Sequence, residues 1–184
     1  VEFASEHIAI EKKRGLKKSL GLAEDSILIS YIAELNTNKN HQFLLRNWKQ
    51  IKQKNPKLEL LLIGAGVKER ELKELVKNKQ LSGIHFLGYR RDVATLLQIT
   101  DIVALLSYRE GLPKSIMEAM VAEIPCIVTN TRGLRDLIRH NENGFVIDHG
   151  NDEKLVEAFT LLGQSQELRE EMGVHAKELV QPFL

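Results

Sequence analysis

The chain has 184 residues, of which 43% are hydrophobic and 28% are charged, so it is long enough to form one domain around a full core. The formal net charge of +1 excludes a protein that depends on a strongly basic surface, and we expect no nucleic-acid partner. No apolar run approaches the ~20 residues of a membrane span, and the single cysteine, Cys126, excludes an internal disulfide. We predict a single domain over residues 1–184.

The first helical pattern covers residues 8–22, with Leu16 and Leu20 on one face and Gly15 as a weak point. Its basic residues are Lys12, Lys13, Arg14, Lys17 and Lys18. We favour a solvated helix whose leucines cover the core, and the alternative is a patch that contacts anionic lipid head groups. The chain opens at Val1 without a methionine, so we expect it to come from a longer protein.

From Ile27 onward, strand and helix patterns alternate along the chain. The predicted strands are residues 27–32, 58–63, 84–87, 102–106, 126–128 and 145–147. The predicted helices are residues 41–54, 69–79, a short helix through Leu97, one that begins at Pro113, a turn at 134–138, and 152–162 and 166–180 separated by Gly163. This alternation predicts an α/β protein with a Rossmann-like parallel sheet and helices on both faces.

The most informative stretch runs from Ser107 to Met120, where a buried strand ends, Gly111 allows a turn and a helix begins. Pro113 is expected at the first helical position, because its φ is fixed and its missing N–H would be unpaired there. The helix N-terminus then points at the carboxyl end of the strand, and its free amides suit a phosphate group. Glu110 lies in the turn, and Glu118 lies about one turn inside the helix.

Each glutamate also has an ordinary interpretation. Glu118 could pair with Lys114 four residues earlier, and Glu110 could be an exposed turn residue. Together, carried on E-G-L-P-x-x-x-x-E-A-M, they resemble the signature of the retaining glycosyltransferases of family 4, which have the GT-B architecture.

Three further turns lead from strands toward the edge where parallel sheets bind ligands. Gly64 and Gly66 open a helix and let the backbone approach a ligand, although a tight turn without a ligand explains them equally well. Lys39 offers a point charge to a phosphate, against the alternative of a solvated loop lysine. Tyr89 offers a stacking face, next to arginines that could simply face solvent.

These turns also match the family. Residues 36–41 lie where the family has an E-K-G-H-like loop, in which a lysine contacts the donor's phosphates, and residues 86–93 match F-L-G-x-x-x-D-V, beside the nucleotide base. Many members have an arginine where this chain has Glu34. Because a carboxylate repels phosphate, either Glu34 points elsewhere or Lys39 alone neutralises the diphosphate.

Later motifs follow in family order as well. Residues 122–128 parallel A-G-x-P-V-V-A, with Glu123 in place of the usual glycine. Residues 133–148 parallel G-x-x-E-x-I-x-x-x-x-x-G-x-L-V, with Asp136 where glutamate is common. The ordered set covers residues 27–179, which is most of the chain.

The resemblance implies that this chain is the C-terminal, nucleotide-sugar-binding half of a GT-B enzyme, whose acceptor-binding N-terminal domain would precede Val1. It implies that Glu110 is the catalytic residue near the donor sugar and that Glu118 holds the ribose hydroxyls. The donor-binding residues that it implies are Lys39, Gly64, Gly66, Tyr89, Gly111, Leu112, Pro113, Ser115 and Glu118.

The expected substrate is a nucleotide-diphosphate sugar, transferred to a saccharide or lipid-linked acceptor in the assembly of a cell-surface polysaccharide or glycolipid. We expect no metal or other cofactor, since the family usually needs none and no His/Asp cluster has metal-ligand spacing. The expected location is the cytoplasm, with peripheral contact with the membrane as an option. Two alternatives stay open: a nucleotide-sugar epimerase of the same architecture, and a non-catalytic module that binds a nucleotide or a partner, to which Glu34 adds weight.

Overall fold

The computed structural model describes residues 10–184, and the predicted helix start at Ile8 lies outside them. Six strands form one sheet in the order β3-β2-β1-β4-β5-β6, and every neighbouring pair is parallel. The strands are β1 (Ile27–Ile32), β2 (Leu58–Ile63), β3 (Ile84–Gly88), β4 (Ile102–Leu105), β5 (Cys126–Thr129) and β6 (Gly144–Ile147). The predicted Rossmann-like parallel sheet is therefore confirmed.

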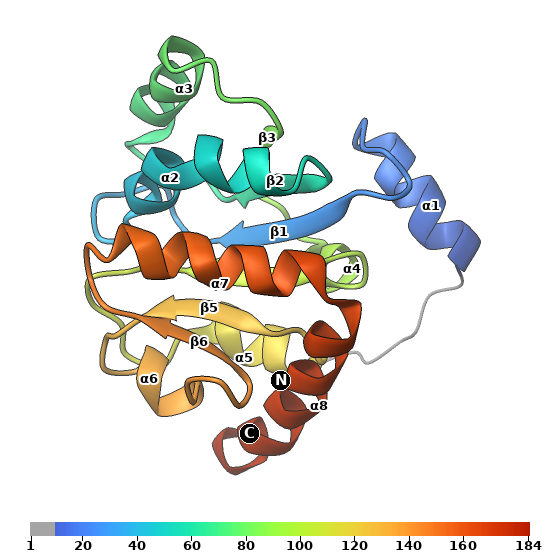
Figure 1. Cartoon of the computed structure of the whole chain (residues 1–184), viewed down its shortest axis with the longest axis vertical. Coiled ribbons are helices and arrows are strands. Elements are labelled where there is room, and N and C mark those ends of the chain that lie inside the picture. Colours follow the sequence, from blue (N-terminus) through green and yellow to red (C-terminus); the bar gives the residue numbers. More distant parts are fainter. Residues whose placement is uncertain (1–9) are drawn as a thin grey trace.

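Helices cover both faces of this sheet, as predicted (Figure 1). They are α1 (Ile10–Ser19), α2 (His41–Lys54), α3 (Glu69–Asn78), α4 (Val93–Leu97), α5 (Lys114–Val121), α6 (Leu134–Leu137), α7 (Asp152–Gln164), α8 (Gln166–Val180) and a 3-10 turn, η1 (Gln181–Phe183). Helices α2 and α7 pack together on one face, whereas α5 lies behind β5 in Figure 1 and packs against α8.

The pleat of the strands divides the core between the two faces. Leu60 and Leu62 of β2 join the larger core, whereas Leu61 and Ile63 point the other way into a smaller cluster around Leu28. Leu16 and Leu20, from α1 and the turn after it, pack against this smaller cluster. The interpretation that these leucines cover the core is confirmed, and contact of α1 with lipid head groups stays a prediction.

Three local predictions were wrong. Pro113 is not the first residue of α5 but precedes it with an extended ψ of 107°. Gly163 does not separate the last two helices, because it lies inside α7, and the chain breaks at Ser165, whose hydroxyl caps α8 through the Leu168 amide. The last strand was predicted to begin at residue 145, but β6 begins at Gly144, where a Cβ would lie 2.1 Å from the carbonyl oxygen of Cys126.

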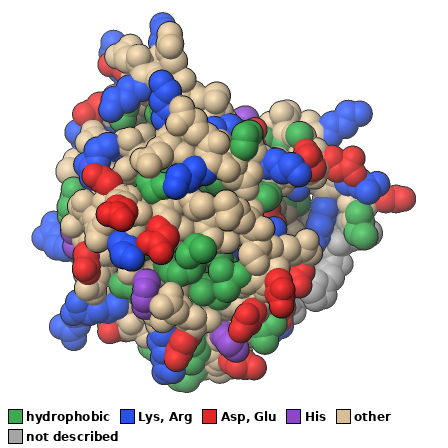
Figure 2. Space-filling model, in the orientation of Figure 1, with side chains coloured by type: hydrophobic (Ala, Val, Ile, Leu, Met, Phe, Trp, Pro, Cys, Tyr) green, Lys and Arg blue, Asp and Glu red, His purple; other side chains and the backbone are tan. Residues whose placement is uncertain are grey.

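The molecular surface carries charges of both signs. Acidic and basic side chains are interspersed over the face shown in Figure 2, in keeping with the net charge of +1. None of the helices in residues 10–184 combines the length and the apolar character that crossing a membrane requires.

Candidate functional site

The strand order of the sheet reverses between its two central strands, β1 and β4, which form the topological switch point. From β1 the chain proceeds to β2 and β3 on one side, and from β4 it proceeds to β5 and β6 on the other. Open parallel sheets bind ligands at this point, outside the carboxyl ends of the strands. The loop after β1 carries Lys39, and the loop after β4 carries Glu110, so the structure brings these two predicted residues together at the switch point.

Lys39 and Glu110 are in direct contact. The Lys39 Nζ lies 2.6 Å from the Glu110 Oε1, and the Ser107 hydroxyl donates to the same oxygen over 2.6 Å. The Glu110 side chain is 9% exposed and that of Lys39 is 23% exposed, so this charge-assisted contact is shielded from water. Glu110 is therefore not the exposed turn residue of the ordinary interpretation.

Asparagines of the β1 loop hold the β4 loop in place. The Asn38 backbone carbonyl accepts from the Tyr108 amide (2.9 Å), and its side chain bonds both the amide (3.1 Å) and the carbonyl (3.0 Å) of Arg109. The Asn40 side chain donates to the Leu106 carbonyl over 3.1 Å. Sequence analysis did not single out these residues, because the partners are some 70 positions apart in the chain.

Beneath the two loops lies a buried aromatic pair. The Tyr31 hydroxyl accepts from the Leu106 amide (3.0 Å) and donates to the Lys39 carbonyl, so it joins both loops. The His41 ring packs on Tyr31 with the centroids 4.4 Å apart, and neither ring nitrogen has a hydrogen-bond partner among the described residues. Burial, together with the charge of Lys39, lowers the pKa of His41 to about 4, so the ring is neutral at pH 7.

The N-terminus of α5 is uncapped beside this ion pair. Pro113 at the N-cap makes no side-chain hydrogen bond, and its carbonyl accepts from Ile116. The backbone amides of the preceding turn and of the first helical residues have no acceptor within residues 10–184; they belong to Gly111, Leu112, Lys114 and Ser115. Such a set of free amides at the positive end of a helix dipole can bind an anion.

Glu118 lies one turn inside α5 and is partly buried, with a side chain that is 21% exposed. Its carboxylate is 3.5 Å from the Lys114 ammonium, so the ordinary pairing is present. The Lys114 side chain is 72% exposed, and such a pair contributes little because water screens it. The Glu118 carboxylate therefore keeps its capacity to accept hydrogen bonds from a ligand.

Gly64 and Gly66 follow β2 on the same edge, and the structure supplies a packing reason for both. A Cβ at Gly64 would lie 2.0 Å from the Ala33 carbonyl oxygen, and one at Gly66 would lie 2.4 Å from that of Leu35. The close approach of the β1 loop thus requires both glycines. Their contact with a donor stays a prediction.

Tyr89 follows β3, farther along the edge, and is 75% exposed, so its ring is open to stacking. The neighbouring Arg90 makes two 2.8 Å hydrogen bonds to the carboxylate of Asp92. Asp92 occupies the N-cap position of α4, and its carboxylate binds Arg90 rather than a helix amide.

Gly133, which precedes α6, shapes the turn that holds Glu110. Its φ is +89°, and a Cβ there would lie 2.2 Å from the Gly111 carbonyl oxygen. The Gly133 amide donates to Asp136 over 3.1 Å, which is the contact that the spacing of these two residues could have predicted. The loop after β5 therefore packs directly on the turn that presents Glu110.

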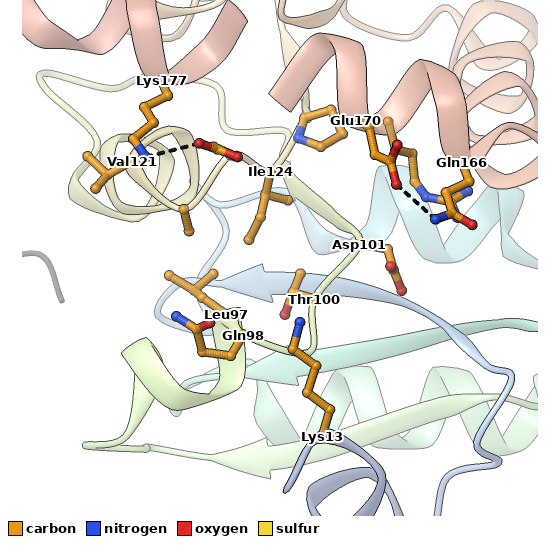
Figure 3. Close-up of a pocket in the computed structure, with 14 residues that line it drawn as sticks. Lys13, Leu97, Gln98, Thr100, Asp101, Val121, Ile124, Gln166, Glu170 and Lys177 are labelled. Carbon is orange, nitrogen blue, oxygen red and sulfur yellow. Dashed lines mark hydrogen bonds and ion pairs between the residues drawn. The ribbon is translucent and has the colours of Figure 1, made fainter. Parts of the chain in front are cut away.

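A hollow of about 510 Å³ lies at the opposite edge of the sheet, at the amino ends of β4 and β5 (Figure 3). Two polar contacts lie at its rim, an ion pair of Lys177 with Glu123 and a hydrogen bond from Gln166 to Glu170. We place the site at the carboxyl edge instead, because free amides and the Lys39–Glu110 pair meet there. Within residues 10–184, no group of three or more His, Cys, Asp or Glu side chains could hold a metal ion.

Comparison with known proteins gives a consistent result. The family model described as Glycosyl transferases group 1 matches residues 12–179. The chain is 34% identical over 175 residues to the "Putative glycosyltransferase EpsD" of Bacillus subtilis, covering 95% of this chain and 46% of that protein. It is 30% identical to the "N-acetyl-alpha-D-glucosaminyl L-malate synthase" of Bacillus anthracis, covering 90% and 43% of the two chains. The chain thus spans less than half the length of these relatives.

Solved structures share the fold. A structure of Anabaena Alr3699/HepE in complex with UDP and glucose superposes with a TM-score of 0.87 at 20% identity, covering 99% of this chain and 50% of that one. The C-terminal domain of the group 1 glycosyl transferase LpcC of Francisella tularensis superposes with a TM-score of 0.84 at 20% identity, covering 99% and 97%.

Proposed function

Because this chain belongs to the glycosyl transferases group 1 family, we propose that it is the donor-binding half of a retaining glycosyltransferase of family 4 with GT-B architecture. The proposed donor is a nucleotide-diphosphate sugar, and the proposed enzyme also has an acceptor-binding N-terminal domain. The observation that carries this proposal is the contact of Lys39 with Glu110 beside the uncapped N-terminus of α5, at the switch point of the sheet.

In the proposed complex, the diphosphate of the donor binds the free amides at the start of α5, from Gly111 to Ser115, and the ammonium of Lys39. Lys39 is then shared with a phosphate, so it neutralises Glu110 less. The negative charge of Glu110 is then less compensated and lies near the sugar. Positive charge grows on the anomeric carbon of that sugar as the bond from this carbon to the phosphate breaks. An interaction that strengthens as this charge develops lowers the barrier to transfer.

The remaining parts of the donor have proposed contacts along the same edge. Glu118 accepts hydrogen bonds from the ribose hydroxyls, and Tyr89 lies beside the base. Glu34 is exposed and bonds Asn36 over 3.1 Å, so a second cation is missing where many members have an arginine. We propose that Lys39 carries the charge compensation of the diphosphate without it.

The acceptor and the location belong to the same proposal. Among the relatives, a protein of Escherichia coli that is 29% identical is named "UDP-Gal:alpha-D-GlcNAc-diphosphoundecaprenol alpha-1,3-galactosyltransferase". By analogy, we propose a saccharide or lipid-linked acceptor, used by a cytoplasmic enzyme that contacts the membrane peripherally.

Calorimetric titration of residues 1–184 with nucleoside diphosphates tests the donor site. We expect one nucleoside diphosphate to bind in a salt-dependent manner and its monophosphate to bind more weakly, because the monophosphate lacks the group that α5 and Lys39 hold. We expect no sugar transfer by this chain alone. Failure of every nucleoside diphosphate to bind would contradict the proposal.

Mass spectrometry of the longer protein, incubated with nucleotide-sugars and acceptors, tests the reaction. A new glycoside is the expected product. An epimerised donor would point to the epimerase, and an unchanged donor bound without reaction would point to a non-catalytic module.

A further inference from the structure

A second polar hollow, of about 280 Å³, adjoins the proposed donor site. Its walls come from the loops that follow β4, β5 and β6, and Glu110 forms one of them. The proposed contacts to the nucleotide and its phosphates come from the loops after β1, β2 and β3, from residues 111–113 at the end of the β4 loop, and from α5. Because Glu110 directly precedes Gly111 in the chain, the hollow adjoins the proposed nucleotide site.

Two arginines stand on its rim. The side chains of Arg109 and Arg132 are exposed and make no hydrogen bond or ion pair within residues 10–184. Among the other arginines of this part of the chain, only Arg91 shares that property, and the rest bind carboxylates, amides or carbonyls. A guanidinium is a planar fork of donors that matches a carboxylate or a phosphate.

Within residues 10–184, Glu110 is the one carboxylate that lines this hollow, and it is already occupied. The Glu110 carboxylate is hydrogen-bonded to Lys39 and to Ser107, each over 2.6 Å. Its negative charge is therefore already compensated without either arginine. The hollow thus presents two cations opposite a carboxylate that is already neutralised, and it has an excess of positive charge.

A flat wall lies beside the arginines. The rings of Tyr108 and His149 are stacked with their centroids 5.6 Å apart and their planes 12° from parallel. The His149 Nε2 lies 3.0 Å from the Thr131 hydroxyl, which also bonds the Ser107 carbonyl over 2.9 Å. These bonds orient the imidazole. A stacked pair next to two cations suits a sugar ring that carries an anionic group.

We propose that this hollow is a subsite for a carboxylate or phosphate group, held by Arg109 and Arg132 and carried either by the donor sugar or by the acceptor. This inference rests on the proposed function, since it assigns an anionic substrate group to the same site. A neutral sugar would leave both guanidiniums without a charged partner.

Residue-resolved NMR titration of residues 1–184 with inorganic phosphate and with methyl glucuronide tests the subsite, with methyl glucoside as the neutral control. We expect both anions, but not the glucoside, to shift signals of Arg132 and His149. Arg109→Gln and Arg132→Gln should each raise the dissociation constant at least fivefold, read at the His149 signal that all the variants keep. Arg91→Gln, which removes the other unpartnered arginine, should leave it unchanged.

Titration with UDP-glucuronic acid and UDP-glucose separates the two sources of the anionic group. If the donor sugar carries it, wild type should prefer the uronate about tenfold and Arg132→Gln should lose that preference. If the acceptor carries it, the two donors should bind alike, and phosphate should still shift Arg132 when UDP is bound.

Absence of anion-dependent shifts at Arg132 and His149, or equal titrations of wild type and both variants, would overturn the subsite. Binding at the proposed donor site is measured separately, from the NMR shifts of the Gly111 and Ser115 amides. Shifts there without shifts at Arg132 would leave the proposed function standing and remove only this inference.

Discussion

The ammonium of Lys39 and the carboxylate of Glu110, 71 positions apart in the chain, lie 2.6 Å from each other. Each is thus the other's counter-ion while no ligand is bound. A diphosphate that takes up Lys39 changes the environment of Glu110, so the two residues should respond to binding together.

The first prediction concerns Lys39→Ala. If Lys39 is the main cation for the diphosphate, its loss should weaken binding of a nucleoside diphosphate by about 1.5–3 kcal/mol, the range for hydrogen bonds to charged groups. Added salt should weaken wild-type binding more than that of the variant. Lys77→Ala, an exposed lysine on α3, controls for the change in net charge. Equal affinities of wild type and Lys39→Ala in calorimetry would return Lys39 to the solvated surface.

The second prediction concerns Glu118→Gln. The substitution keeps the shape of a partly buried side chain but weakens its capacity to accept charge-assisted hydrogen bonds. We expect it to raise the dissociation constant of the donor and to leave turnover of bound donor nearly unchanged. Lys114→Gln removes the ion pair to Glu118 and should have a small effect on binding. A much larger loss in turnover than in affinity for Glu118→Gln would speak against a role in ground-state binding.

The third prediction concerns Glu110→Gln in the longer protein that includes the acceptor-binding half. Donor affinity should stay within a few fold, while turnover should fall on the order of 10²-fold, as for the loss of one electrostatic stabiliser. Measured donor affinity and single-turnover rates decide between the roles. The assignment fails if Glu110→Gln abolishes binding while turnover per bound donor survives.

The fourth prediction compares two glycines with positive φ. Ala at Gly150, where φ is +77° and no atom lies within 4 Å of an added Cβ, should cost about 1–2 kcal/mol from the left-handed backbone alone. Ala at Gly133 should cost more, since its Cβ would also meet the Gly111 carbonyl oxygen at 2.2 Å and displace the Glu110 turn. Urea unfolding measures both, and donor binding should fall only for Gly133→Ala. Equal stabilities of the two variants would show that the Glu110 turn can move away from the added Cβ without a cost in the free energy of unfolding.

The fifth prediction concerns His41 and pH. Its pKa is about 4 in the folded protein and ~6.5 in an unfolded chain, so the unfolded state binds more protons between these values. The folded state is therefore fully stable above pH 6.5 and loses stability as the pH falls toward 4. At pH 5 the free energy of unfolding should be lower by about 2 kcal/mol than at pH 7.5 through this group alone.

His41→Leu removes the ring nitrogens that lack partners, so it should flatten this part of the pH dependence. His175→Gln, at an exposed histidine of α8, should not. Urea unfolding of the three proteins at pH 5 and pH 7.5 gives the comparison, in which the raised pKa of the partly buried Asp101 contributes equally to all. An unchanged pH dependence in His41→Leu would rule out the buried ring as its source.

Periodicity was enough to predict the fold, because the chain alternates strands and helices whose apolar patterns are distinct. Strands β1 and β2 have the predicted bounds, as do α2 and α8. Pro113 and Gly163 were misassigned because the preferences of single residues do not fix where a helix begins or where it ends. Tertiary packing places Gly163 inside α7, against Asn55 and Leu58.

The geometry of the candidate site could be predicted only in part. The turn from Glu110 to Ser115 was recognisable because its residues are contiguous, and so its amides could be proposed as a phosphate site. The contact of Lys39 with Glu110 could not be predicted, since it depends on the pairing of β1 with β4. The need for glycine at position 133 could not be predicted either. A Cβ there would clash with the carbonyl oxygen of Gly111, and a helix and a strand separate the two residues in the chain.

The position of the site between β1 and β4 also affects how the protein folds. Strand β1 pairs on one side with β2, the next strand in the chain, and on the other with β4, more than 70 positions away. Closing such a long loop is slow and entropically costly, so this pairing depends on the collapse of the rest of the sheet. A ligand bound across β1 and β4 would fasten the first half of the chain to the second, so the proposed nucleotide binding would also raise global stability.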